Sequence, residues 1–227
     1  MKHVLITGGS DGLGKITAQK LHAAGYAVTI LSRDESRTKA AAEEMGCKYV
    51  VADVADYAQL DHAIEQAVDQ NGPVDVLINC AGIWIAGALE ANKPEDIERT
   101  IATNVLGTIY ATRAVVPAMK ERKSGRIVNI SSQVGLKYPT ERSVYAASKW
   151  AVTGFTKVMQ TELKPHNISV VGFYPGGMTT GMFAKVGDMK DRSKALDPHI
   201  AADTLVYLCG LPENVEVPEL GIESLDY

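Results

Sequence analysis

The chain has 227 residues, a formal net charge of −4 at pH 7 and a sequence pI near 5.8. A chain of this length suits one large domain that buries most of its apolar surface. Because acidic residues outnumber basic ones, we expect no basic surface for nucleic acid or for an anionic membrane, and neither as a partner.

Cysteine spacing and hydropathy argue against three further classes. Three scattered cysteines fit neither a disulfide framework nor zinc-ligand spacing, so we expect no metal and a reducing, cytoplasmic location. The most apolar stretch, 74–91, is interrupted by Asp75, Asn79 and Glu90, which argues against a membrane span. Residues 1–7 read directly as a strand, and no signal-peptide pattern precedes them.

Short runs rich in valine and isoleucine alternate with helical patterns along the chain. Continuous apolar strands separated by helices predict a parallel sheet covered on both faces. We therefore expect an α/β fold over 1–227: a single Rossmann-type doubly wound parallel sheet of six to seven strands. The predicted strands are 3–7, 27–31, 49–52, 74–78, 126–130, 168–173 and, at an edge because of Pro218, a short strand within 215–222. The predicted helices are 13–24, 35–45, 57–70, 94–121, 143–164 and 198–209.

A glycine-rich turn follows the first predicted strand, where residues 7–14 read Thr-Gly-Gly-Ser-Asp-Gly-Leu-Gly. Glycines let the backbone approach a pyrophosphate, and the N-terminus of the next helix supplies amide donors and a positive dipole. A strand, a glycine turn and a helix in this order indicate nucleotide binding. Asp11 and Asp34 suit turn or helix-cap positions.

Tyr145 and Lys149 lie four residues apart in a predicted helix and therefore share one of its faces. A free phenol loses its proton near pKa 10. An ammonium about 4 Å away would favour the phenolate by roughly 4 kcal/mol at an effective dielectric constant near 20. The pair thus predicts a tyrosine that exchanges a proton with an alcohol or carbonyl oxygen. Alone, such a pair is also common on ordinary helices.

Taken together, the motifs between residue 3 and about 182 resemble those of the short-chain dehydrogenases/reductases of the NADP-preferring type. The resemblance implies an oxidoreductase that transfers a hydride between a nicotinamide cofactor and a carbonyl compound or secondary alcohol. The motifs that carry it are Thr-Gly-x-x-x-Gly-x-Gly at 7–14, Asn79-Cys80-Ala81-Gly82, Asn104, Ser132, Tyr145-x-x-x-Lys149 and Pro175-Gly176.

The resemblance also implies a role for each catalytic residue. Tyr145 would be the general acid and base, and Lys149 would lower its pKa and hold the nicotinamide ribose. Ser132, rather than Ser131, would bond the substrate oxygen, and Asn104 would support a water chain that reaches the lysine. The implied cofactor-binding residues are Gly8, Ser10, Asp11, Gly12, Leu13, Gly14, Ser32, Arg33, Asp53, Val54, Asn79, Ala81, Gly82, Tyr145, Lys149, Pro175, Gly176 and Thr180.

The end of the second predicted strand bears on the choice of cofactor. An acidic residue there would bond both ribose hydroxyls and repel a 2′-phosphate. This chain has Ser32 followed by Arg33, and a guanidinium can bind a phosphate through two hydrogen bonds. By resemblance we expect NADP(H) in preference to NAD(H), although Asp11 stands where many NADP-preferring relatives carry a base.

We expect residues 177–195 to form a lid over a mostly apolar substrate pocket. Its glycines give backbone freedom, and its apolar side chains need a surface to cover. The residues expected to line the pocket are Ser132, Trp84, Val134, Tyr138, Met178, Met182 and Phe183.

The helices 94–121 and 143–164 carry more apolar positions than one buried face requires. In the family such helices pair across a two-fold interface, so we expect a homodimer or homotetramer. The residues concerned are Ile101, Val105, Ile109, Val116, Val152, Phe155, Val158 and Met159.

Two departures from the family pattern and three alternative functions remain. Cys80 replaces the asparagine that is usual beside the cofactor, and residues 211–220 resemble the ending of shorter members related to 3-hydroxy acid dehydrogenases. The alternatives are an NAD-linked alcohol dehydrogenase, a cofactor-sensing protein that lost turnover, and an epimerase or dehydratase of the extended branch. The last expects another glycine spacing and a longer C-terminal part. The sequence leaves the substrate open.

Overall fold

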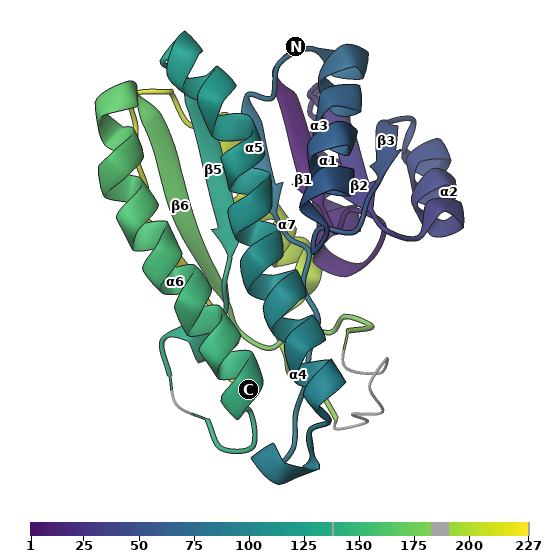
Figure 1. Cartoon of the computed structure of the whole chain (residues 1–227), viewed down its shortest axis with the longest axis vertical. Coiled ribbons are helices and arrows are strands. Elements are labelled where there is room, and N and C mark those ends of the chain that lie inside the picture. The colour runs from purple at the N-terminus through teal and green to yellow at the C-terminus, as the bar shows by residue number, and fades with distance from the viewer. Residues whose placement is uncertain (138, 183–190, 227) are drawn as a thin grey trace.

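The computed structural model describes residues 1–137, 139–182 and 191–226. Within these residues, seven parallel strands form one sheet in the order β3-β2-β1-β4-β5-β6-β7 (Figure 1). The predicted doubly wound parallel sheet is thereby confirmed. The strands are β1 (His3–Thr7), β2 (Ala27–Ser32), β3 (Lys48–Val51), β4 (Val76–Asn79), β5 (Gly125–Ile130), β6 (Ile168–Pro175) and β7 (Glu219–Ile222).

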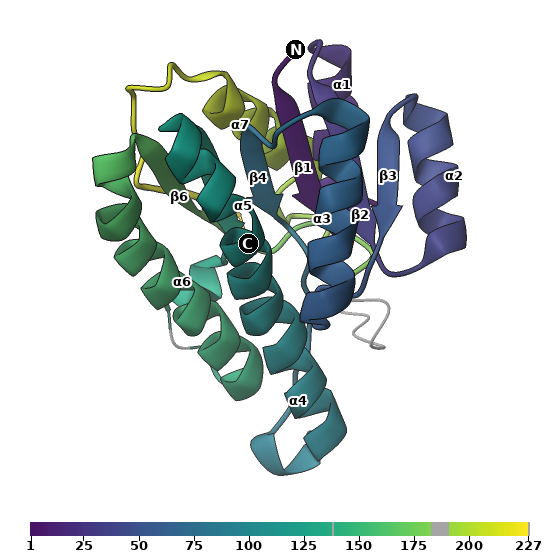
Figure 2. The ribbon, with the colours of Figure 1, turned by 45° about the horizontal axis from the view of Figure 1, so that its top comes forward.

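Helices cover both faces of this sheet. One buried apolar cluster joins the sheet to α1, α2 and α7, and a second joins its other face to α3, α5 and the end of α6. Side chains alternate between the faces, since Val4 and Ile6 belong to the first cluster and Leu5 to the second. In Figures 1 and 2, α5 and α6 cross the near face and α7 lies behind the sheet. The helices are α1 (Gly12–Ala23), α2 (Glu35–Met45), α3 (Tyr57–Asn71), α4 (Pro94–Ile101), α5 (Gly107–Arg122), α6 (Ser143–Leu163) and α7 (Pro198–Gly210).

The strand order places the crevice of this sheet. The chain winds from β1 outward to β2 and β3, then returns to β4 on the other side of β1. At such a reversal, the loops that leave the carboxyl ends of β1 and β4 diverge and open a ligand site. That edge is at the lower end of the sheet in Figure 1, on the side of α4.

Two predicted elements have different bounds in the structure. The predicted helix 94–121 is α4 and α5 with a π-helical turn between them, Ala102–Leu106. The predicted closing strand begins only at Glu219, where it pairs in parallel with β6. Pro218 comes directly before it, and its missing N–H therefore interrupts no strand pairing.

Some residues expected at a subunit interface also pack within the subunit. Val152 is buried, and Val116 and Met159 pack against the cluster on the α5 side. Val158 is 56% exposed and keeps its expected orientation. Across the described residues, no helix combines the length and the apolar character that crossing a bilayer requires.

A buried arginine ties the last helix to the sheet. Arg126, in β5, is 5% exposed, and its Nη1 donates to the carbonyls of Leu208 and Leu211 at 2.6 and 3.0 Å. Its Nη2 donates to the carbonyls of Pro212 and Val215, both at 3.0 Å. One guanidinium thus satisfies carbonyl groups at the end of α7 and in the loop that leads to β7.

We predict that Arg126→Met lowers the free energy of unfolding by about 3 kcal/mol, because methionine fills the space but leaves buried carbonyls without a donor. Urea unfolding followed by circular dichroism measures the change. Arg99→Met is the matched control, since Arg99 lies on the surface and its ion pair with Asp96 is exposed. Equal stability of the two variants would contradict the role given to Arg126.

Candidate active site

The four predicted catalytic residues meet at the carboxyl edge of the sheet. Ser132 lies close enough to the Tyr145 hydroxyl to lower its pKa, and Lys149 Nζ lies 5.7 Å from the Tyr145 ring centroid. Asn104 Nδ2 donates to Ser148 Oγ, at 3.0 Å, between those two residues in α6. The candidate catalytic side chains therefore come from three separate segments: the π turn, the end of β5 and the first half of α6.

The helix α6 positions the tyrosine and the lysine on its buried face. Ser148 Oγ donates to the Tyr145 carbonyl at 2.7 Å. Ser131 Oγ donates to the Lys149 carbonyl at 3.0 Å, so this serine faces the helix. Ser132 is extended, and its Oγ accepts from the amide of Val134 at 3.1 Å. Because side chains alternate along an extended chain, Ser132 turns toward Tyr145 while Ser131 does not.

Asn104 lies in the π turn, which explains how a residue poorly suited to a helix interior occupies one. Its Oδ1 accepts from the Ile83 amide at 2.8 Å, and its Nδ2 donates to the Ile83 carbonyl at 3.0 Å. Single π turns inside helices occur often at functional sites. The π turn thus orients the buried side-chain amide of Asn104 so that it bonds both to the loop after β4 and to α6.

Burial moves the two key pKa values in opposite directions. Burial raises the pKa of Tyr145 to about 12, opposed by the Ser132 hydrogen bond and the charge of Arg142. Burial also lowers the pKa of Lys149 to about 8. Lys149 is not among the groups that shift the pKa of Tyr145 in this structure, so the role expected of it stays a prediction. The ammonium donates to the Ile130 carbonyl at 2.9 Å, and removal from water disfavours both charged forms.

The glycine turn packs tightly between β1 and α1. Gly8 has φ +70°, and a Cβ there would lie 2.8 Å from the Ala81 Cα. A Cβ on Gly14 would lie 2.4 Å from the Gly8 carbonyl oxygen. Asp11 is the N-cap of α1 and accepts from the Gly12 amide at 2.7 Å, as a cap residue should. The turn leaves the first amides of α1 facing the crevice in a close-packed backbone.

Thr7, the first residue of the glycine motif, links this turn to the loop after β4. Thr7 Oγ1 accepts from the amides of both Cys80 and Ala81 at 3.1 Å. Gly82 follows, and a Cβ there would lie 3.4 Å from Asn104 Oδ1 and 3.8 Å from Lys149 Nζ. Burial raises the pKa of the Cys80 thiol to about 11, so it stays protonated near neutral pH.

The end of β2 holds the residues that were expected to read the cofactor phosphate. Ser32 Oγ accepts from the Ser10 amide at 3.3 Å, which joins it to the glycine turn. The Arg33 guanidinium lies 3.9 Å from Asp53 Oδ2; the Arg33 side chain is 58% exposed and that of Asp53 is 37% exposed. Thr180 lies beside the same turn, with its Cβ 3.8 Å from where a Gly12 Cβ would stand.

Other predicted site residues turn away from the crevice. Asn79 Nδ2 donates to Asn129 and Thr112, within a buried polar network under α5. Leu13 belongs to the apolar core, and Val54 packs against the backbone of Gly107. These side chains therefore pack beneath the crevice and do not line it.

The C-terminal end of the predicted site is described in part. Pro175 ends β6, and the Gly176 amide donates to the Ile222 carbonyl at 2.7 Å. Met178 pairs with Leu196 in a β-bridge and packs against the core. Met182 is half-buried. Tyr138, Phe183 and the middle of the predicted lid, 183–190, lie outside the described residues.

Two side chains near the tyrosine form an aromatic and cationic wall. The Trp84 ring meets the Tyr145 ring edge to face, with centroids 4.5 Å apart and planes at 64°. The Arg142 guanidinium carbon lies 5.3 Å from the Trp84 ring centroid. Trp84 was expected at this wall, and Arg142 was missed. Its position three residues before Tyr145, at the start of α6, could have identified Arg142 from the sequence.

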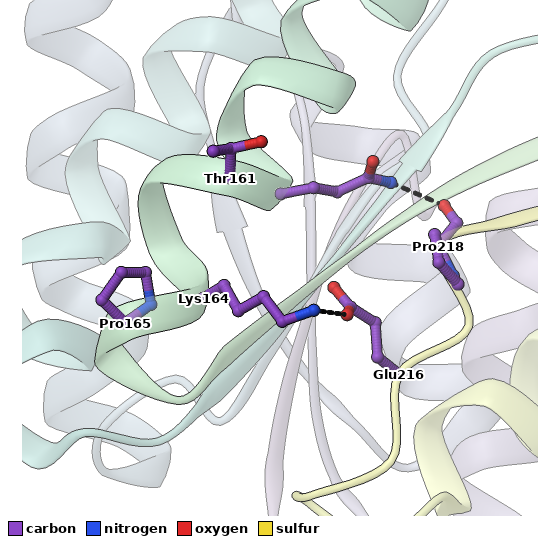
Figure 3. A pocket seen from close by; sticks show the side chains of 6 residues that line it. Thr161, Lys164, Pro165, Glu216 and Pro218 are labelled. Carbon is purple, nitrogen blue, oxygen red and sulfur yellow. Dashed lines mark hydrogen bonds and ion pairs between the residues drawn. The ribbon is translucent and has the colours of Figure 1, made fainter.

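A surface hollow of about 410 Å³ lies at the other end of α6 (Figure 3). Lys164 pairs with Glu216 across it at 3.3 Å, and Gln160 donates to the Pro218 carbonyl at 2.7 Å. Gln160 lies about four turns, or roughly 22 Å, along the helix from Tyr145. The hollow is thus separate from the candidate active site. Among the described residues, no group of three or more His, Cys, Asp or Glu is arranged to hold a metal ion.

Sequence comparison finds a family and several curated relatives. The family model of the short chain dehydrogenases matches residues 2–191. The 3-ketodihydrosphingosine reductase of Bos taurus is 37% identical over 212 residues, 89% of this chain and 63% of that protein. The trans-4-hydroxycyclohexanecarboxylate dehydrogenase of Sinomonas cyclohexanicum is 38% identical over 194 residues, 81% of this chain and 74% of that protein. The chain spans less than two thirds of the bovine, zebrafish and mouse reductases that it matches.

Structural comparison finds the same fold with a nicotinamide cofactor bound. An alcohol dehydrogenase from the archaeon Thermococcus sibiricus, complexed with 5-hydroxy-NADP, is similar with a TM-score of 0.91 and 26% identity. The similarity covers 100% of this chain and 98% of that chain.

We predict that Gly14→Ala weakens NADP(H) binding at least tenfold, or roughly 1.4 kcal/mol, because the new Cβ would displace the backbone of the turn. Fluorescence titration with NADPH measures the affinity. Gly154→Ala is the matched control, since a Cβ at that position in α6 meets nothing within 4 Å. Wild-type affinity in Gly14→Ala would show that the turn is not the cofactor cradle.

Proposed function

Because this chain belongs to the short-chain dehydrogenase family, we propose that it transfers a hydride between NADP(H) and a carbonyl compound or secondary alcohol, with Tyr145 as the general acid and base. The observation that carries the proposal is the convergence of Ser132, Tyr145 and Lys149 at one edge of the sheet, held by Asn104. A cofactor-sensing protein without turnover would not require this complete set.

The protonated phenol of Tyr145 supports carbonyl reduction. With its pKa raised to about 12, the phenol holds its proton at neutral pH and can give it to a carbonyl oxygen. Ser132, beside the phenol, would add a second donor to the same oxygen. Trp84 covers one side of the Tyr145 ring and excludes water there. In the reverse direction, the phenolate form of Tyr145 would take the proton of the alcohol.

The residues of the crevice suit a dinucleotide. The close-packed turn at Gly8 and Gly14 and the amides at the start of α1 would hold the pyrophosphate. Lys149 has hydrogen atoms left to donate to a ribose beside its bond to the Ile130 carbonyl. When bound, the nicotinamide supplies or accepts the hydride.

We assign the preference for NADP(H) to Arg33. Its contact with Asp53, at 3.9 Å and largely exposed, contributes little to stability, so the guanidinium can turn to a 2′-phosphate at small cost. The small Ser32 leaves room beside it. The 5-hydroxy-NADP bound to the archaeal neighbour supports this choice. An NAD-linked alcohol dehydrogenase is the alternative.

The substrate, the assembly and the location remain predictions. The names of the relatives make 3-ketodihydrosphingosine and hydroxy acids of cyclohexane the first compounds to test. Leu106, Trp150 and Val158 expose apolar surface on the π turn and α6, which supports a homodimer or homotetramer. A cytoplasmic location stays the expectation from the scattered cysteines.

We predict that Tyr145→Phe removes at least 99% of turnover while folding and NADPH binding are retained, because phenylalanine keeps the ring and loses the proton donor. Steady-state oxidation of NADPH with a panel of ketones and aldehydes measures turnover. Tyr110→Phe is the control, since Tyr110 stacks on Tyr57 away from the site. Retention of a tenth of the wild-type rate would refute the assignment.

We predict that Arg33→Ala weakens NADP(H) binding about ten- to a hundredfold, because a charge-assisted contact to the phosphate is lost. The affinity for NAD(H) should change less than twofold. Lys39→Ala, an exposed change one turn into α2, controls for general charge loss. Equal losses for both cofactors would mean that Arg33 does not read the 2′-phosphate.

A further inference from the structure

Arg142 is a cation at the mouth of the proposed active site. Its guanidinium stacks over the Trp84 ring, and that ring in turn meets the Tyr145 ring. The charge of Arg142 is close enough to favour the phenolate form of Tyr145. The guanidinium is therefore one aromatic ring away from the reacting phenol.

Two features hold Arg142 in this place. The backbone carbonyl of Glu141 accepts from the Gly87 amide at 2.8 Å, which ties the segment before α6 to the loop that carries Trp84. The Arg142 carbonyl accepts from the Ala146 amide at 2.7 Å, as the first bond of the helix. The cation is thus positioned by two fixed elements.

The start of α6 disfavours a cation, although the Trp84 ring contacts this one. Arg142 is the N-cap of α6, its side chain makes no capping bond, and the first turn contains no acidic residue. A positive charge at a helix N-terminus opposes the helix dipole, and arginine is not a preferred N-cap residue. Neither local helix stability nor capping accounts for an arginine here.

Ion pairs do not compensate for this charge within the described part of the chain. Within residues 1–137, 139–182 and 191–226, the ion pairs include neither Arg142 nor the nearby Lys149. Arg142 is only partly exposed, so its charge is less screened than that of a surface arginine. A planar guanidinium in such a place matches a carboxylate with two parallel bonds.

We propose that Arg142 binds a carboxylate of the substrate, so that the enzyme acts on oxo acids and hydroxy acids whose carboxylate stands a few carbons away from the reacting carbon. The inference rests on the proposed function for the reaction itself. The hydride goes to the carbonyl carbon and the Tyr145 proton to its oxygen, while the carboxylate stays unchanged. An amino ketone with an ammonium group would be repelled by the same side chain.

The kinetic test compares 4-oxocyclohexanecarboxylate with 4-oxocyclohexanecarboxamide, which has nearly the same shape without the charge. In the wild type we expect kcat/KM with NADPH to be about ten- to a hundredfold higher for the carboxylate. Arg142→Gln should remove this preference and Arg142→Lys should restore part of it. If Arg142 acted only through Tyr145, Arg142→Gln would slow both compounds equally, and that result would overturn the proposal.

A binding test is independent of turnover. The chain has two tryptophans, so Trp150→Phe leaves Trp84, under Arg142, as the fluorescent reporter. Titration in the presence of NADP⁺, which cannot reduce the ketone, should give at least tenfold tighter binding of the carboxylate than of the carboxamide. This difference should vanish in Trp150→Phe/Arg142→Gln.

The outcomes distinguish a failure of the proposed reaction from a failure of the proposed anion site. Selective binding of the carboxylate without turnover of either compound would refute the proposed reaction and keep the anion site. Turnover of both compounds with equal kcat/KM and equal affinity would keep the reaction and overturn the anion site.

Discussion

The amide of Asn104 is the interaction on which the proposed active site depends. It bonds to both backbone groups of Ile83 in the loop after β4 and to Ser148 in α6. These bonds are made from a π turn that interrupts the path from α4 to α5. A regular helix would rotate the side chain by a large fraction of a turn, and a single residue would no longer reach both partners. The irregular turn therefore fixes the separation between the strand loop and the helix that carries Tyr145.

Burial determines the protonation of this site more than the pairing of its charges does. Tyr145 and Lys149 both lie away from water, and each is pushed toward its neutral form. The lysine directs one hydrogen bond at the Ile130 carbonyl, and its Nζ lies 5.7 Å from the centroid of the Tyr145 ring. The phenol consequently remains a proton donor, which is the form that carbonyl reduction needs.

Most of the fold could be predicted because its determinants are local. Valine-rich strands, helical periodicity and the glycine turn all lie in short windows, and the seven-stranded sheet agrees with them. Arg126 had no such signal, since its carbonyl partners are 82 to 89 residues away in sequence. The π turn was missed because its residues also suit an ordinary helix.

The candidate site was predictable to the extent that motif positions fix the backbone. Ser132 could be chosen over Ser131 because side chains alternate along an extended chain, and the structure separates the two as expected. The same alternation turns the Asn79 side chain into the polar network under α5, which its motif position did not reveal. The effect of burial on the pKa of Tyr145 could not be predicted, because the sequence gives the spacing of Tyr145 and Lys149 but not their burial.

With the proposed roles of Arg33, Lys149 and Arg142, the cations along the crevice would give a chain with a net charge of −4 a local preference for anions. Arg33 lies at the end of β2, Lys149 in the middle and Arg142 at the start of α6. An acidic surface with a cationic crevice repels polyanions such as nucleic acid but still draws small anions to the site. A dinucleotide with a 2′-phosphate and an oxo acid would each bring negative charge to one end, with the reacting carbonyl between them at Tyr145. Arg33 would then bind the cofactor phosphate and Arg142 the substrate carboxylate. These two contacts would orient the cofactor and the substrate relative to each other.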